Sequence, residues 1–111
     1  MSKKSKGACP ALDVLGNPIR REILGLLSAR QRSVGELAEQ LPVSRPAVSK
    51  HLRLLEDGGF VTCSAQGNRN LYRLEARGFD EARSWLDRFW SDALARFKIT
   101  AENTVPRKRH G

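Results

Sequence analysis

The sequence has few of the residues that cross-link a small domain or hold it in a membrane. Its two cysteines, Cys9 and Cys63, are too few for a disulfide framework, and a cytosolic compartment would keep them reduced. No apolar run approaches the roughly 20 residues that a transmembrane helix needs. Gly7, Pro10 and Asp13 interrupt what would have to be the apolar core of a signal peptide. We therefore expect a cytoplasmic protein with no membrane partner.

The chain also lacks the residue constellations of an enzyme. It shows no nucleophile–base pair, no paired carboxylates of a cleft and no glycine-rich loop of the kind that cradles phosphates. We expect neither catalysis nor a cofactor, and no small-molecule effector is evident.

Positive charge is abundant. The 111 residues carry a formal net charge of +8, which favours a polyanionic partner such as nucleic acid. That length predicts one domain, and the 40% hydrophobic content fits a globular one. We expect the domain at residues 10–99, between flexible basic arms at residues 1–9 and 100–111, because neither arm has apolar periodicity.

Three helix-start signals divide the first half of the domain. Asn17 precedes Pro18 as a cap, Ser33 and Glu36 form a capping box, and Ser44 caps a further helix. Apolar residues recur at helical spacing after each signal. The expected helices span residues 11–15, 18–29, 33–41 and 44–57.

The last two of these helices are separated by Pro42 and Val43 alone. Val48, Leu52 and Leu55 line one face of the second helix, which opens with polar and basic residues. Two short helices joined by so tight a turn are typical of a helix-turn-helix.

A hairpin and a long helix follow. Residues 61–65 and 69–74 alternate in polarity on either side of Gly67-Asn68, which predicts a two-residue turn. A hairpin directly after a helix-turn-helix is a wing. The predicted fold is therefore a winged helix-turn-helix, mainly α with a small β-hairpin wing: four helices, the hairpin, and a final helix over residues 78–99.

The final helix contains both tryptophans and three of the four phenylalanines. Exposed aromatic surface of this extent is uncommon on monomers, so we expect a homodimer, although the helix could instead fold back on its own domain. The predicted dimer interface draws on helices at both ends of the domain and comprises Leu12, Leu15, Phe79, Ala82, Trp85, Leu86, Phe89, Trp90, Ala93 and Phe97.

The ordered set of motifs resembles the ArsR/SmtB family of transcriptional repressors. The resemblance covers residues 12–97 and is closest to the metal-free branch of SdpR-like autorepressors. It rests on residues 17–24, 34–38, 44–55, 59–61, 67–69 and 71–74.

The sequence departs from the family at its metal sites. Many members bind metal through a Cys-x-Cys cluster on the helix that corresponds to residues 33–41, which here has no Cys and no His. A second family site uses Asp and His on the last helix, which here offers Asp80, Glu81, Asp87 and Asp92 but no histidine. We expect no metal.

The predicted DNA contacts lie on the helix from Ser44 and on the wing. Arg45 is expected to contact guanine O6 and N7, Pro46 a thymine methyl, and Ser49 to permit close approach. Lys50 and Arg53 are expected to contact phosphates, and Ser44 to cap the helix and reach a phosphate. Asn68, Arg69 and Arg73 of the wing are expected to reach a minor groove or a flanking phosphate.

We therefore expect a homodimeric repressor that binds an inverted-repeat operator in double-stranded DNA. Three alternatives remain open: a sequence-indifferent, architectural nucleic-acid binder, a thiol-responsive repressor that uses Cys9 and Cys63, and a winged helix that binds proteins. His51 is expected to pack or hydrogen-bond at the domain surface rather than to bind metal.

Overall fold

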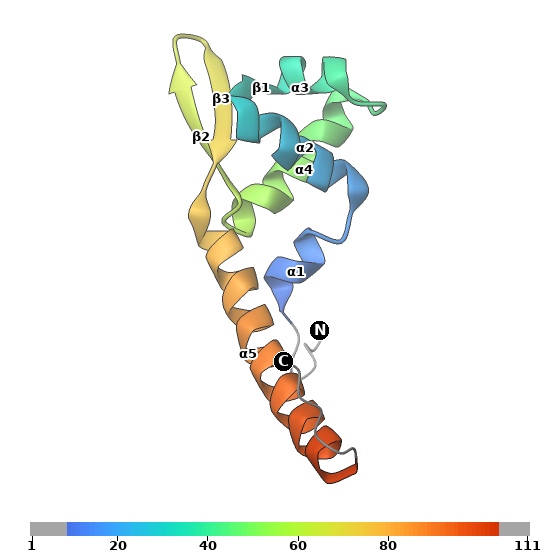
Figure 1. Cartoon of the computed structure of the whole chain (residues 1–111). Coiled ribbons are helices and arrows are strands. Elements are labelled where there is room, and N and C mark those ends of the chain that lie inside the picture. The colour runs from blue at the N-terminus through green and yellow to red at the C-terminus, as the bar shows by residue number, and fades with distance from the viewer. Residues whose placement is uncertain (1–8, 105–111) are drawn as a thin grey trace, which may run out of the picture.

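The computed structural model describes residues 9–104, with the side chains of residues 9–97, and the winged helix-turn-helix prediction is confirmed (Figure 1). The helix-turn-helix and a small sheet lie at one end, and the last helix extends away from them. In chain order the elements are α1 (Pro10–Val14), α2 (Pro18–Ala29), β1 (Arg32–Ser33), α3 (Val34–Gln40), α4 (Arg45–Asp57), β2 (Val61–Gln66), β3 (Arg69–Leu74) and α5 (Ala76–Thr104).

The three predicted capping residues each begin a helix. The Asn17 side chain accepts hydrogen bonds from the backbone N–H groups of Ile19 and Arg20, at 2.8 and 3.1 Å. Ser33 accepts from the N–H of Glu36 at 3.2 Å, and Glu36 accepts in return from the N–H of Ser33 at 2.9 Å. These bonds satisfy donors that have no partner within a helix, which is why the starts of α2 and α3 are well defined.

The sheet has one strand more than predicted. β3 lies between β2 and the two-residue β1, and both pairings are antiparallel. β1 was missed because two residues are too few to show alternation. Gly67, at the hairpin turn, has φ +65°, whereas Asn68 has no positive φ, so only the first turn position needs glycine.

Helix α5 differs from its prediction at both ends. It begins at Ala76 rather than residue 78 and continues through Thr104, so residues 100–104 are helical and not part of a tail. The rest of the predicted arms, residues 1–8 and 105–111, lies outside the described residues. No helix within residues 9–104, α5 included, combines the length and apolar content that crossing a membrane takes.

The core lies between α2, α3, α4 and the base of the wing. Its largest fully buried side chains are Phe60, Ile23, Leu37, Leu52, Leu55, Val48 and Val61. The predicted inward face of α4 is therefore confirmed.

The first turn of α5 crosses the loop after α4 at very short range. The N–H of Gly78 donates to the carbonyl oxygen of Gly59 at 2.8 Å, and a Cβ on Gly78 would lie 2.6 Å from the carbonyl oxygen of Gly58. Beside this crossing, the rings of Phe60 and Phe79 meet edge to face at 4.8 Å. Only glycine at position 78 allows the two backbones to approach so closely, and this crossing fixes the direction in which α5 leaves the domain.

Candidate nucleic-acid interface

Helix α4 presents two opposite faces. Val48, Leu52 and Leu55 are at most 1% exposed, so the helix is anchored along one side. The residues predicted to contact DNA from this helix are all exposed: Ser44, Arg45, Pro46, Ser49, Lys50 and Arg53. They form a polar, cationic surface with three positive charges and no carboxylate among its members.

Ser44 begins this helix as predicted. Its hydroxyl accepts a hydrogen bond from the N–H of Ala47 at 3.3 Å, and its carbonyl accepts from the N–H of Val48 at 3.0 Å. The cap fixes the position of the first turn, from which Arg45 and Pro46 project. Packing of α3 against α4 then sets the angle between the two helices.

The Arg45 side chain lies back over α3. Its guanidinium Nη2 and Cζ are 3.1 and 3.5 Å from the position that a Cβ on Gly35 would occupy. A side chain at position 35 would therefore displace Arg45. The role of Gly35 was missed in the sequence, where a glycine early in a seven-residue helix was the available signal.

Glu36 joins three elements. Besides its capping bond to Ser33, its carboxylate lies 3.2 Å from Nη2 of Arg69 at the start of β3 and 3.8 Å from Nη1 of Arg30 at the end of α2. The Ser33 N–H and the two arginines hold the pKa of Glu36 below its ordinary value. The sequence identified Glu36 only as a capping residue.

The exposed end of the wing carries the other predicted DNA contacts. Asn68, Arg69 and Arg73 are all exposed. Arg69 is turned toward α3 by Glu36, whereas Arg73 lies opposite Thr62 in the strand register. The structure thus brings the wing turn beside the helix-turn-helix and leaves Arg73 farther along the strand.

A cavity of about 310 Å³ opens where these elements meet. Arg45 of α4 and Arg69 of β3 both line it, together with polar side chains of the wing turn. The lining residues are Ser33, Val34, Gly35, Arg45, Asn68, Arg69 and Asn70.

His51 lies on the far side of α4, half-buried against α2. Its Nδ1 is 3.3 Å from Nη1 of Arg20, whose Nε donates to the carbonyl oxygen of Val14 at 2.7 Å. Burial lowers the pKa of His51, and the charges of Arg20 and Lys50 lower it further. A neutral ring accepts the Arg20 hydrogen bond, so the predicted structural role of His51 is confirmed.

A second surface lies on α5. Its apolar side chains beyond the first turns are exposed: Leu86 by 43%, Phe89 by 53%, Trp90 by 58%, Leu94 by 52% and Phe97 by 69%. The rings of Trp85 and Phe89 stack at 5.4 Å. Figure 1 shows that this part of α5 extends past α1 and away from the rest of the described chain.

The other predicted dimer residues differ in exposure. Ala82 is 5% exposed and belongs to the same buried cluster as Ala11 of α1, so it is a core residue of its own chain rather than an interface residue. Phe79 packs on Phe60 and is half-buried, as are Leu12, Leu15 and Ala93. Leu94, absent from the predicted interface, lies on the same exposed surface of the helix.

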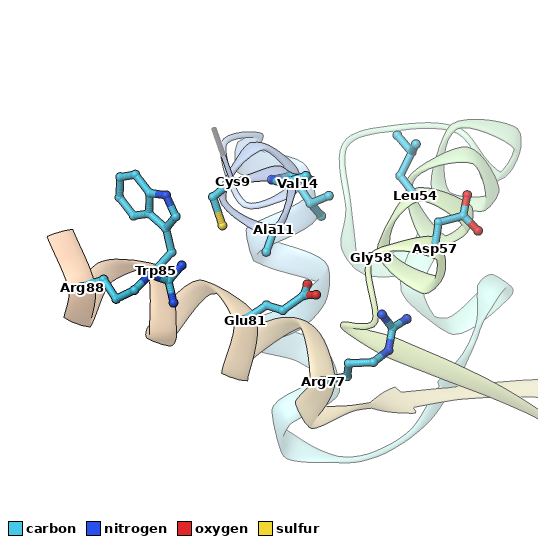
Figure 2. Close-up of a pocket in the computed structure, with 11 residues that line it drawn as sticks. Cys9, Ala11, Val14, Leu54, Asp57, Gly58, Arg77, Glu81, Trp85 and Arg88 are labelled. Atoms are coloured by element: carbon cyan, nitrogen blue, oxygen red, sulfur yellow. The ribbon is translucent and has the colours of Figure 1, made fainter. Parts of the chain in front are cut away.

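The N-terminal half of α5 forms a groove of about 560 Å³ with α1 and the end of α4. Figure 2 shows the side chains of Cys9 and Ala11 pointing from α1 toward α5, with Trp85 beside them. Arg77 and Arg88 line the groove, but so do Asp57 and Glu81, and these four charges balance.

The two cysteines lie in different parts of the fold. Cys9 precedes α1 beside α5, whereas Cys63 lies in β2 opposite Tyr72. Burial raises the pKa of Tyr72, and a hydrogen bond with the Cys63 thiol raises it further. Both thiols are free, and the structure does not bring them together as a pair.

Comparison with known proteins agrees with this geometry. A family model described as a helix-turn-helix domain matches residues 15–64. The HTH-type transcriptional regulator Rv2034 of Mycobacterium tuberculosis is 44% identical over 84 residues, which cover 76% of this chain and 78% of the relative. The arsenical resistance operon repressor of Staphylococcus xylosus is 37% identical over 76 residues, covering 68% of this chain and 73% of the relative.

The fold has the same relatives. The solved structure of an ArsR-like transcriptional regulator from Rhodococcus sp. RHA1 is 28% identical and superposes with a TM-score of 0.78. The alignment covers 88% of this chain and 92% of that structure. The structural match is therefore not confined to the helix-turn-helix.

Proposed function

Because this chain belongs to the ArsR/SmtB family of winged helix-turn-helix transcription regulators, we propose that it represses transcription by binding an inverted-repeat DNA operator as a homodimer, without a metal effector. Its relatives regulate transcription and are not enzymes. The observation that carries the proposal is the two-sided α4, with an anchored apolar side and an exposed cationic side.

The exposed side of α4 suits a DNA major groove. Such a groove admits one α-helix, and the first residues of a recognition helix reach the base edges. Ser49 lies one turn after Arg45 and is small enough to let the helix approach the bases. Lys50 and Arg53 lie where they would contact phosphates, which hold the protein in register.

The exposed apolar surface of α5 supports a homodimer. Five large apolar side chains there are at least 43% exposed in the single chain, and a second copy would remove them from water. Two copies carry two reading helices. These would enter successive major grooves, about 34 Å apart, and the operator would have matching two-fold symmetry.

The side chains available as metal ligands support a regulator that works without a metal. Helix α3 contains neither Cys nor His. Among the described side chains of residues 9–97, no three of His, Cys, Asp or Glu lie together as a site for a metal ion would require. Soft metal ions prefer thiolate or imidazole ligands, which neither α3 nor α5 supplies.

Selection of bound duplexes from random DNA by the full chain tests the proposal. The expected result is one inverted repeat, retained equally with zinc, with a chelator, and with or without reductant. Sedimentation should give the mass of a dimer. Equal retention of all duplexes would indicate sequence-indifferent binding, and loss of binding on oxidation would indicate a thiol switch. The first result would contradict the proposal, and the second would favour the thiol-responsive alternative.

Two matched variants test whether DNA binds to the exposed side of α4. Ser49→Glu places a carboxylate on the exposed side of α4 and should abolish retention. Ser84→Glu places the same charge on exposed α5 and should leave retention unchanged.

A further inference from the structure

We propose that the cavity between α3, α4 and the wing takes a single phosphate of the DNA backbone, held jointly by Arg45 and Arg69. This inference rests on the proposed function and assigns Arg45 to a phosphate, in place of the guanine contact expected from the sequence. The cavity has the position, the charge and the polar lining that such an anion needs.

The Arg45 side chain is not directed as a base-reading arginine would be. An arginine that reads a base extends from the recognition helix into the major groove, but Arg45 lies back across Gly35 of α3. In a helix-turn-helix the first helix crosses the DNA backbone. The guanidinium of Arg45 is therefore directed toward the side on which backbone phosphates pass.

The cavity also has positive charge that can bind an anion. Arg45 has no carboxylate within ion-pair distance among the described residues, so its charge is available to a ligand. Arg69 reaches the same cavity from another element and is more than half exposed. Two guanidinium groups match the planar, bidentate hydrogen-bonding geometry of phosphate oxygens.

Glu36 is the positioning residue of this site. It does not line the cavity, but its carboxylate holds Nη2 of Arg69 at 3.2 Å and thereby keeps the wing turn beside α3. Arginine has five N–H donors, so Arg69 can retain Glu36 while its other donors bind a phosphate. The amides of Asn68 and Asn70 and the hydroxyl of Ser33 supply further polar contacts to the cavity.

A double-mutant cycle tests the shared phosphate. The full chain and its Arg45→Ala, Arg69→Ala and doubly substituted variants are titrated with a selected duplex and a random duplex. Each single change should weaken binding to both duplexes alike, by about tenfold for each bound protomer, as expected for a charge-assisted hydrogen bond. The double change should weaken binding by much less than the product of the two single effects.

Salt dependence gives a second readout that a change in folding would not mimic. On duplex DNA, each phosphate that a protein neutralises contributes about 0.9 to the slope of log affinity against log salt. Because a dimer carries one such cavity on each protomer, the slope of the double variant should be smaller by about 1.8, whereas arginines on separate phosphates would reduce it by about 3.6. Arg83→Ala on exposed α5 is the control for charge and should change neither affinity nor slope.

Neutral methylphosphonates, introduced one at a time, locate the phosphate. One position per half-site should weaken the wild type but not the double variant, whereas the positions contacted by Lys50 and Arg53 should weaken both. Multiplicative effects of the two substitutions, a slope change of about 3.6, or an Arg45→Ala variant with relaxed preference at one base pair would overturn the inference. If the wild type shows no sequence preference, the proposed function fails, but the same cycle on the random duplex still decides the phosphate site.

Discussion

Arg69 and Glu36 form an ion pair of 3.2 Å that links the wing to the first turn of helix α3. The two residues are far apart in the sequence, and each also has a local structural role in its own element. Glu36 completes the capping box of α3, and Arg69 begins β3 directly after the wing turn. The wing is thus attached to the helix-turn-helix at its exposed end as well as through the sheet at its base.

Glu36→Gln should separate these two roles. Glutamine also completes a capping box, so the fold is expected to persist, but the charge that holds Arg69 and Arg30 is removed. Removing a carboxylate beside DNA phosphates should raise affinity for random DNA about twofold to fivefold, in line with the small energies of exposed ion pairs. The ratio of operator to random affinity should stay unchanged, since Arg69 is proposed to contact a phosphate and phosphate contacts do not distinguish sequences.

Competition binding measures that ratio, and Glu39→Gln is the matched control. Glu39 is exposed on the same helix and has no ion pair within the described part of the chain. If both substitutions changed random-DNA affinity equally, the effect would be one of net charge rather than of the Glu36–Arg69 pair.

The aromatic surface of α5 predicts the oligomeric state. Trp90 is 58% exposed, so Trp90→Glu should leave the fold of one chain intact while placing a charge in the proposed dimer interface. We expect the sedimenting mass to fall to that of one chain and operator affinity to fall at least tenfold, because two half-sites are no longer bound together. Ser91→Glu, on the exposed polar side of the same helix, should sediment as the wild type does. An unchanged mass for Trp90→Glu would place the interface elsewhere.

Replacing either of two glycines with alanine should change the free energy of unfolding, in opposite directions at the two positions. Gly78→Ala forces a Cβ to 2.6 Å from the carbonyl oxygen of Gly58 and 2.8 Å from the ring of Phe60, which should lower the free energy of unfolding by about 1–3 kcal/mol. Gly25→Ala, within α2, meets nothing within 4 Å and should raise the free energy of unfolding by about 0.5–1 kcal/mol. Urea unfolding monitored by tryptophan fluorescence and circular dichroism measures both. Equal effects would refute the close approach at Gly78.

The lowered pKa of His51 predicts that the stability of the fold depends on pH. Its pKa in the fold lies below the ordinary 6.5, chiefly because of burial, so the unfolded chain binds a proton more readily than the folded one. The contribution of His51 is therefore fully present above pH 6.5 and is lost as pH falls from 6.5 through the lowered pKa. His51→Gln keeps an acceptor for Arg20 but does not titrate. The fall in unfolding free energy between pH 7.5 and pH 5 should be smaller in this variant than in the wild type, and an identical fall would contradict the assignment.

Local signals in the sequence predicted the helices closely. Asn17, Ser33 and Ser44 each accept a backbone hydrogen bond, and each helix begins at the next residue. Caps are local, so neighbouring residues suffice to identify them. The same holds for the wing turn, where Gly67 takes the positive φ that the turn demands.

Contacts between distant residues were not predictable in this way. Nothing near Arg69 indicates Glu36 as its partner, because the pairing depends on how the wing returns to α3. The position of Arg45 over Gly35 depends likewise on the angle between two helices. Ala82 was assigned to the dimer surface because its helix is apolar over a wide arc, and only the packing of α1 reveals which part of that arc is already covered.

The two surfaces of this fold lie on separate elements: α4 and the wing carry the proposed DNA contacts, and the exposed half of α5 carries the aromatic residues. After a gene duplication, the two copies could therefore diverge in either property independently. Substitutions on α5 would decide whether the copies still exchange subunits, while each copy kept its ancestral operator. Substitutions at the exposed residues of α4 would move a copy to new promoters without altering its assembly. One ancestral regulator could thus give rise to several regulators that neither exchange subunits nor share promoters.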